Sequence, residues 1–327
     1  MKALVTGATG FIGSHLVELL LHRGYSARCL IRKTSDPVWL KGLAVEYVYG
    51  DLFDEIALKG AVQGVDVIYH SAGVTKAKTA EGYYRGNSTG TRNLLAAAAE
   101  HNRSLTRFVH ISSQAAAGPS PSAAPINEDA PATPLTTYGK SKWEAERECH
   151  RMMPVLPITI VRPPAVYGPR DKDIFEFFKT MSKGLQPMVG FREKYVSLIH
   201  VTDLVRGFVM AGESPKTAGQ TYFITSSEAY GWKEIGDVTR EIMGRSALRL
   251  RIPEAGIYAI AAFAEFFALF SPQPALINFE KARDMVQNSW TCSGGKAKAD
   301  FGFEQEIFLE QGIRETVEWC RAQGWIR

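Results

Sequence analysis

The sequence predicts an α/β protein built on a doubly wound parallel sheet, with a smaller C-terminal lobe. Two observations support this fold class: apolar strand-like runs alternate with helical runs through the first half of the chain, and the chain opens on a strand, a glycine turn and a helix. The expected strands are Lys2–Thr6, Ser26–Ile31, Val45–Tyr49, 65–70, Arg107–Ile111, Ile158–Arg162 and 221–225, and the clearest helices are 11–23, 91–101 and 140–152.

The opening element carries the strongest local signal. Lys2–Thr6 is a short apolar run typical of a buried parallel strand, and glycines follow at Gly7, Gly10 and Gly13. An apolar helical pattern then runs on until Gly24 ends it. A glycine turn between a strand and a helix places backbone N–H groups at a helix N-terminus, where a pyrophosphate can bind. The element therefore predicts a dinucleotide site.

Composition predicts a globular protein with no nucleic-acid partner. The 327 residues are 45% hydrophobic and 22% charged, and the formal net charge is only +4, with no basic run. The four cysteines (Cys29, Cys149, Cys292 and Cys320) are widely spaced without a C-x-x-C motif, which indicates free thiols in a reducing compartment. Because the first strand begins at residue 2, we expect no signal peptide and a cytoplasmic location. No metal site is predicted.

The alternating pattern weakens in the second half. Residues 114–136 are rich in Ala, Pro and Ser and are predicted to form a loop over the site. After Gly168 the regular alternation of strands and helices fades. We therefore expect a dinucleotide-binding domain at residues 1–167, completed by the strand at 221–225, and a mainly substrate-binding lobe at 168–327.

Tyr138 and Lys142 form a candidate catalytic pair. They stand four residues apart on a predicted helix, so both side chains emerge on one face. A lysine ammonium beside a phenol favours the phenolate, so Lys142 is expected to lower the pKa of Tyr138. Ser113 follows the strand Arg107–Ile111 and adds a hydroxyl. The alternative for Tyr138 is a partly buried helix tyrosine without a chemical role.

Four motifs in order resemble the extended branch of the short-chain dehydrogenase/reductase superfamily: TGATGFIG at 6–13, the serines at 112 and 113, Y-x-x-x-K at 138–142, and R-P-x-x-V-Y-G-P at 162–169. Residues 296–303 and 309–319 are more weakly similar to its closing helices. The resemblance implies a Rossmann-type fold. It also implies that Ser113 holds the substrate oxygen, Tyr138 transfers its proton and Lys142 binds the nicotinamide ribose, with Ser113 preferred over Ser112.

The resemblance also assigns a nicotinamide dinucleotide to the glycine turn. The residues expected to contact it are Gly7, Thr9, Gly10, Phe11, Ile12, Gly13, Arg32, Lys33, Asp51, Leu52, Ser71, Ala72, Gly73, Asn87, Ser112, Tyr138, Lys142, Pro163 and Val166. Asp51 would contact adenine, unless it only closes a strand-end turn, and Asn87 would support Lys142, unless it is a helix N-cap.

Cofactor choice is predicted at the end of the second strand. Arg32 and Lys33 follow this strand, and no carboxylate appears before Asp36. An NAD enzyme of this type commonly has an acidic residue here for the ribose 2′-hydroxyl, whereas basic residues pair with a 2′-phosphate. The sequence favours NADP, with NAD as the alternative if these two residues are only solvated loop charges.

Three functions remain open. The favoured one is an NADP-dependent reductase or dehydrogenase acting on a ketone or secondary alcohol of an apolar small molecule, similar to the 3β-hydroxysteroid dehydrogenase and dihydroflavonol reductase group. The alternatives are a nucleotide-sugar epimerase with tightly bound NAD and a non-catalytic dinucleotide sensor. Gln114 stands where dehydratases of the branch carry an acidic pair, which disfavours a dehydratase. Val196 stands where sugar-nucleotide enzymes carry an arginine, and the nearby Arg192 is out of register, which disfavours a sugar-nucleotide substrate.

An aromatic helix is predicted at residues 255–270. Phe263, Phe266, Phe267 and Phe270 follow i, i+3, i+4, i+7 spacing, and the stretch is too short to span a bilayer comfortably. A core helix or a contact between copies of a homodimer is the favoured interpretation. A membrane-surface anchor and a lid over an apolar substrate pocket are the alternatives.

Overall fold

A seven-stranded parallel sheet organises the molecule. The computed structural model describes residues 1–268, 270 and 277–326. The strands are β1 (Lys2–Thr6), β2 (Ser26–Ile31), β3 (Val45–Tyr49), β4 (Val67–His70), β5 (Arg107–Ile111), β6 (Ile158–Arg162) and β10 (Gln220–Phe223). Their order is β10-β6-β5-β4-β1-β2-β3, and every neighbouring pair is parallel. The predicted fold class is confirmed.

The strand bounds differ from the sequence prediction at two places. β4 begins at Val67 rather than at residue 65, and the Asp66 carboxylate just before it accepts a hydrogen bond from the backbone N–H of Lys2 at 2.6 Å. β10 covers Gln220–Phe223 rather than 221–225. The other five strands have the predicted bounds, because each is a short apolar run ended by a turn residue or a helix signal.

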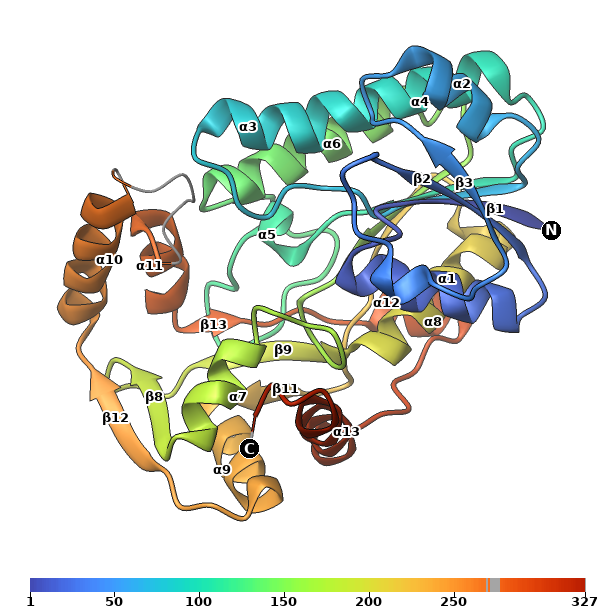
Figure 1. The fold of residues 1–327 in the computed structure, drawn as a ribbon. Helices are drawn as coiled ribbons and strands as arrows, with labels where there is room; N and C mark the ends of the chain where they lie inside the picture. Colours follow the sequence, from blue (N-terminus) through green and yellow to red (C-terminus); the bar gives the residue numbers. More distant parts are fainter. Residues whose placement is uncertain (269, 271–276, 327) are drawn as a thin grey trace.

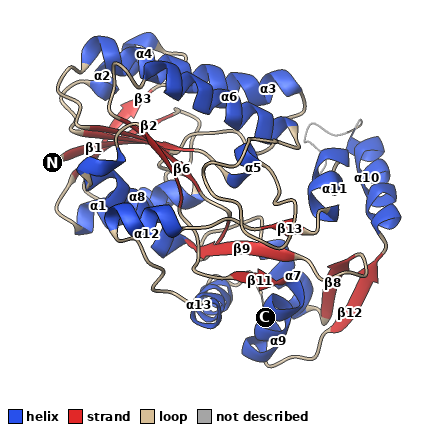
Figure 2. Cartoon of the chain, turned by 180° about the vertical axis from the view of Figure 1, so that it is seen from behind, coloured by secondary structure: helices blue, strands red, loops and turns tan. Residues whose placement is uncertain are grey.

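Helices cover both faces of the sheet (Figures 1 and 2). On one face lie α1 (Phe11–His22), α8 (Val201–Glu213) and α12 (Gly295–Phe301), and on the other lie α2 (Glu55–Val62), α4 (Gly90–His101) and α6 (Thr137–Met152). The apolar stripe of each helix is buried against the strands, as Leu16 and Leu20 of α1 and Leu94 of α4 illustrate. This double layer explains why the central strands β1, β4, β5 and β6 are buried on both faces, whereas the edge strand β3 is only partly buried.

Smaller sheets and the remaining helices make up the rest of the molecule. β7 (Ala165–Tyr167), β9 (Tyr195–His200), β11 (Ala229–Gly231) and β13 (Ser289–Trp290) form a four-stranded sheet, and β8 (Leu185–Val189) pairs with β12 (Leu248–Ile252). The helices here are α7 (Phe175–Ser182), α9 (Trp232–Met243), α10 (Glu254–Ala268), α11 (Phe279–Val286) and α13 (Leu309–Ala322). No helix in the described ranges is long and apolar enough to cross a membrane.

The segment at 114–136 differs from the predicted loop. It starts with a short helix, α5 (Gln114–Ala117). Further along, Ile126 pairs with Cys292 and the carboxylate of Glu128 accepts a hydrogen bond from the backbone of Phe223, so the segment is held against the C-terminal half. Its last residue, Thr136, caps α6. The four cysteines are all buried and unbonded to one another.

The helix α3 (Ala80–Tyr84) and a π-helical turn (Arg85–Thr89) precede α4, so the chain enters α4 through a continuous helical run. Sequence periodicity predicted only residues 91–101 of this run. The extra turn matters because it buries Asn87, which lies against the N-terminal part of α6.

A buried ion pair joins α6 to the sheet. The Arg162 guanidinium at the end of β6 donates two hydrogen bonds to Glu146 of α6, from Nε to Oε1 at 2.9 Å and from Nη2 to Oε2 at 2.6 Å. The hydroxyl of Ser112, which follows β5, donates to the same carboxylate. Glu146 is fully buried and Arg162 nearly so. This bidentate contact therefore fixes α6 against β5 and β6 at one point.

Removing the Glu146 carboxylate leaves the Arg162 charge buried without its partner. We expect Glu146→Ala to lower the free energy of unfolding by about 3–5 kcal/mol, measured by urea denaturation. Glu144→Ala is the matched control, because Glu144 lies on the same helix and pairs with Arg147 and Arg151 at the surface. That control should change stability by less than about 1 kcal/mol. Equal losses in the two variants would contradict a special role for the buried pair.

Candidate active site

The glycine turn after β1 is shaped for close backbone contacts. Gly7 has a φ of +72°, and a Cβ there would lie 2.7 Å from the backbone nitrogen of Ala72. A Cβ on Gly13 would lie 2.2 Å from the carbonyl oxygen of Gly7. Gly10 is the N-cap of α1, and neither a capping side chain nor an acidic residue in the first turn occupies the helix start. The free backbone N–H groups at the start of α1 are therefore suited to bind a pyrophosphate.

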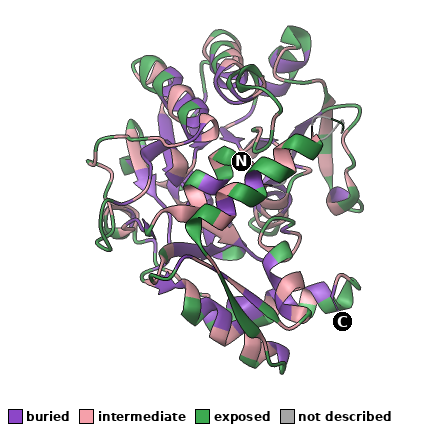
Figure 3. Cartoon of the chain, turned by 90° about the vertical axis from the view of Figure 1, so that its left-hand side faces the viewer, coloured by how far each residue is buried: buried purple, intermediate pink, exposed green. Residues whose placement is uncertain are grey.

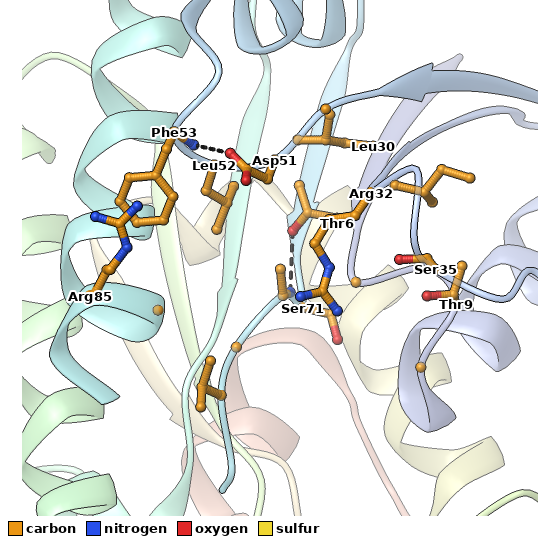
Figure 4. A pocket seen from close by; sticks show the side chains of 18 of the residues that line it. Thr6, Thr9, Leu30, Arg32, Ser35, Asp51, Leu52, Phe53, Ser71 and Arg85 are labelled. Atoms are coloured by element: carbon orange, nitrogen blue, oxygen red, sulfur yellow. Dashed lines mark hydrogen bonds between the residues drawn. The ribbon is translucent and has the colours of Figure 1, made fainter. Parts of the chain in front are cut away.

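A cleft of about 560 Å³ opens beside this turn. It lies at the carboxyl ends of β1 and β4, where the strand order reverses, and this is where doubly wound sheets bind their ligands. Its lining includes Thr6, Gly7, Thr9, Gly10, Leu30, Ile31, Arg32, Ser35, Gly50, Asp51, Leu52, Phe53, Ser71, Ala72, Gly73, Val74, Gly82, Arg85 and Gly86. Figure 4 shows the side chains of this cleft.

The basic residues after β2 are separated by the structure. Arg32 lines the cleft together with Ser35, and Figure 4 shows its side chain pointing into the space between the Asp51 and Thr9 sides. Lys33 is exposed and does not line the cleft, and neither does Asp36. Within the described ranges, no carboxylate forms an ion pair with Arg32. This charge is therefore available to an anionic ligand.

A smaller pocket of about 160 Å³ continues from the cleft and shares Ser71, Gly73 and Val74 with it. Its lining brings together all three predicted catalytic side chains, Ser113, Tyr138 and Lys142. The predicted cofactor contacts Ile12, Asn87, Ser112, Pro163 and Val166 also line it. The strand ends of β5 and β6 and the first turns of α6 thus meet at one point.

Ser112 and Ser113 have different surroundings. The hydroxyl of Ser112 donates to the buried Glu146 carboxylate. Ser113 is less buried, caps α5 by accepting a hydrogen bond from the backbone N–H of Ala115, and lies within hydrogen-bonding distance of Tyr138. The placement is consistent with the preference for Ser113 as the residue that contacts substrate.

The expected lowering of the Tyr138 pKa is not found. Burial raises the pKa of Tyr138 above its usual value, and the hydrogen bond with Ser113 opposes this only in part. Lys142 is engaged elsewhere: its Nζ donates to the carbonyl oxygen of Ile111 at 2.7 Å. The expected lowering of the Tyr138 pKa therefore fails in this arrangement, because desolvation of the phenol dominates.

The pKa of Lys142 is also shifted from its usual value. Burial lowers its pKa to about 8, and the charge of Glu146, one helical turn further along α6, opposes the shift. The ammonium form therefore predominates at neutral pH. Because the side chain is nearly fully buried, this charge acts in a poorly solvated pocket, where its effect on a neighbouring oxygen is large.

Asn87 supports the site through a neighbour of Lys142. Its side-chain amide donates to the hydroxyl of Ser141 at 2.8 Å and to the carbonyl of Val74, and its oxygen accepts from the backbone N–H of Val74 at 2.7 Å. It lies inside the π-helical turn, so the N-cap alternative is wrong. Asn87 ties the loop after β4 to α6.

An outer chamber of about 480 Å³ adjoins the small pocket and shares Thr75 and Tyr138 with it. Apolar lining comes from Ala77, Ile174, Ile277 and Met285. The charged lining consists of four carboxylic residues (Asp173, Glu176, Glu280 and Asp284) and two lysines (Lys76 and Lys281). Lys76 is already paired with Asp173 at 2.6 Å. The described lining thus has an excess of acidic groups.

Sequence reasoning both over-predicted and missed cleft residues. Phe11, Gly13 and Lys33 do not line the three described cavities; Gly13 instead packs against the turn. The missed residues include Phe53 and Arg85, whose guanidinium lies 3.9 Å from the Phe53 ring centroid, and the whole α11 side of the outer chamber. No motif marks α11, because its contact with α6 joins residues more than 100 positions apart.

Comparison with known proteins agrees with this geometry. The model of the NAD dependent epimerase/dehydratase family matches residues 3–225. The chain belongs to this family, within the extended short-chain dehydrogenase/reductases, as the motifs indicated.

Individual relatives include both reductases and epimerases. The chain is 33% identical to the ceramide reductase of Caulobacter vibrioides, over 98% of this chain and 95% of that protein. It is 34% identical to a putative dihydroflavonol 4-reductase of Synechocystis, over 99% and 95%. A UDP-glucuronic acid 4-epimerase from Bacillus cereus, solved with UDP-glucuronic acid and NAD, superposes with a TM-score of 0.79 over 99% of this chain and all of that one, at 24% identity, which shows a shared fold.

The buried lysine should leave a signature in the pH dependence of stability. The folded-state pKa of Lys142 is about 8, below the value of about 10.4 for an unfolded lysine. Between these values the unfolded chain binds more protons, so the free energy of unfolding should rise with pH, by on the order of 3 kcal/mol from this residue. Urea denaturation near neutral pH and near pH 10 should show that the stability of wild type relative to Lys142→Met increases by this amount, because the other titrating groups, including the buried cysteines, are common to both proteins.

Lys140→Met is the control for this comparison, because Lys140 is exposed on the same helix. This variant should follow the pH dependence of wild type. If Lys142→Met also follows the pH dependence of wild type, then burial does not lower the pKa of the lysine.

Proposed function

We propose that the protein is an NADPH-dependent reductase of a lipid-like ketone. The observation that carries this proposal is the continuity of the three cavities: a cleft beside an uncapped helix N-terminus, then the pocket lined by Ser113, Tyr138 and Lys142, then a chamber with apolar walls and excess acidic charge. The sequence motifs and the family support a nicotinamide cofactor.

The cofactor proposal rests on Arg32. It is the cleft-lining cation directly after β2, and Ser35 beside it offers a hydroxyl. A guanidinium is well suited to pair with the 2′-phosphate that distinguishes NADP from NAD. Asp51 and Leu52 would lie beside the adenine end, and Ser71, Ala72 and Gly73 along the dinucleotide.

The reaction proposed for the chain's own residues is a proton transfer. A bound nicotinamide dinucleotide supplies the hydride for the carbonyl carbon. Ser113 donates a hydrogen bond that orients the carbonyl oxygen, and Tyr138 delivers its phenolic proton to that oxygen. Lys142, held cationic at neutral pH, stabilises the charge that the proton leaves on Tyr138. Asn87 holds α6 against the loop after β4 through its hydrogen bonds to Ser141 and Val74.

The substrate proposal rests on the outer chamber. A sugar nucleotide carries a diphosphate, and a chamber whose described lining holds four acidic residues against two lysines would repel it. Val196, where sugar-nucleotide enzymes place an arginine, lies on β9. The apolar wall suits a hydrocarbon group, and the reductase relatives support a ketone on such a molecule. These points favour the reductase over the epimerase.

The proposal includes the division of the chain. Residues 1–167 with β10 (Gln220–Phe223) would hold the cofactor, and most of 168–327 would hold the substrate, since α7 and α11 line the outer chamber. A cytoplasmic homodimer remains the proposed setting.

Nucleotide preference tests the role of Arg32. We expect NADPH to bind more tightly than NADH, and Arg32→Ala to remove most of the difference, because losing a charge-assisted contact costs roughly 1.5–3 kcal/mol, about tenfold to a hundredfold in affinity. Lys33→Ala, the neighbouring cation outside the cleft, should change little. Titration followed by cofactor fluorescence measures the affinities of wild type and of each variant for NADPH and NADH. Equal affinity of wild type for the two cofactors would rule out the assignment.

The catalytic proposal is tested at Tyr138. Tyr138→Phe removes only a hydroxyl, so folding and cofactor binding should survive, while single-turnover reduction falls by about 10²–10⁴-fold. Tyr83→Phe is the matched control, because the Tyr83 ring lies 6.4 Å from that of Tyr138 in the same chamber. Turnover of Tyr138→Phe within a few-fold of wild type would show that the proton comes from another group.

A further inference from the structure

The helix α10 presents an aromatic face to solvent. Only Ile257 and Ala261 of this helix are buried. The residues that we call the aromatic face are Ile260, Phe263, Phe266, Phe267 and Phe270, with Phe279 at the start of α11, and each is between 41% and 79% exposed. Figure 3 views the molecule from this side. The predicted core role of the helix is therefore wrong, and position 269 of the predicted stretch lies outside the described residues.

The aromatic side chains form a continuous surface. The rings of Phe266 and Phe267 lie 5.6 Å apart, and those of Phe266 and Phe270 lie 5.7 Å apart. Phe279 lies at the start of α11, where its backbone N–H donates to the Glu265 carboxylate at 2.9 Å and its ring stacks on Tyr258 at 6.4 Å. A contiguous exposed patch of this kind on a globular protein usually marks an interaction site.

A single helix, α11, separates the aromatic face from the outer chamber. α10 packs on α11 through Ile257, Ala261 and Ala282. The other side of α11 lines the outer chamber through Glu280 and Asp284. Glu280 also accepts hydrogen bonds from the backbone and hydroxyl of Thr137, the residue before Tyr138. The aromatic face thus lies about one helix diameter, roughly 10 Å, from the chamber wall.

Charge on the two helices is arranged asymmetrically. Three acidic groups lie toward the protein: Glu265 accepts from Phe279, Glu280 accepts from Thr137, and Asp284 lines the outer chamber. Glu254, at the far end of α10, lies 3.9 Å from the Lys194 ammonium.

One basic group of α11, in contrast, lies away from the chamber. Arg283 is exposed one helical turn after Phe279, whereas Lys281 lines the outer chamber. The outward charge next to the aromatic face is therefore positive, which complements an anionic surface.

We propose that the aromatic face docks on an anionic lipid membrane, with α10 lying in the interfacial plane. Aromatic side chains with flanking cations are the composition that interfacial helices use, and a fifteen-residue helix is too short to span the bilayer. Docking would place the outer chamber beside the bilayer surface, so an apolar ketone could enter without crossing water. The substrate part of this inference rests on the proposed function; the docking part does not.

Sedimentation with lipid vesicles tests the docking. Wild type should sediment with vesicles of mixed phosphatidylcholine and phosphatidylglycerol, less with phosphatidylcholine alone, and less again at high salt. Phe263→Ser/Phe267→Ser should weaken sedimentation by about tenfold or more. Arg283→Gln should reduce the preference for the anionic lipid. Phe308→Ser, which alters an equally exposed phenylalanine outside the face, is the control and should sediment like wild type.

Competing outcomes are separated by parallel measurements. NADPH binding by each variant reports folding, and light scattering reports the oligomeric state. Failure of wild type to sediment, or equal sedimentation of all variants, would overturn the proposal. So would a dimer that Phe263→Ser/Phe267→Ser dissociates while vesicles remain unbound, because the face would then contact a second copy of the chain. None of these readouts requires turnover, so a wrong substrate assignment would not affect them.

Discussion

The buried contact between Glu146 and Arg162 is the constraint on which the active site depends. A carboxylate and a guanidinium removed from water must remain paired, so α6 cannot slide or rotate against β6 without a large cost. Lys142 and Tyr138 precede Glu146 by one and two turns on the same helix, and Ser112, bonded to the same carboxylate, immediately precedes Ser113. The positions of all three proposed catalytic side chains thus follow from one ion pair.

The site joins three environments in a continuous series. Backbone N–H groups at the start of α1 and the Arg32 guanidinium suit an anionic dinucleotide, whereas the acidic and apolar outer chamber suits a substrate without phosphate. Between them, the small pocket combines a buried cation at Lys142 with a buried phenol at Tyr138. Opposite electrostatic preferences at the two ends give each ligand one place to bind.

Local signals made most of the fold predictable. The strands could be predicted because buried parallel strands are uniform apolar runs, and the glycine turn because only glycine fits beside Ala72 at Gly7. Tyr138 and Lys142 were found through their spacing. Glu146 was missed because an isolated glutamate on a helix resembles a solvated charge until its partner on β6 is known. The Tyr138 pKa and the exposure of α10 depend on tertiary burial, which spacing does not encode.

The stoichiometry of cofactor use tests the proposed reaction most directly. Purified protein would be incubated with NADPH and a panel of long-chain ketones and sugar nucleotides, while NADPH absorbance and product formation are followed together. We predict that one NADPH is oxidised for each ketone reduced and that sugar nucleotides are unchanged. Conversion of a sugar nucleotide without net consumption of cofactor would contradict it and identify an epimerase instead.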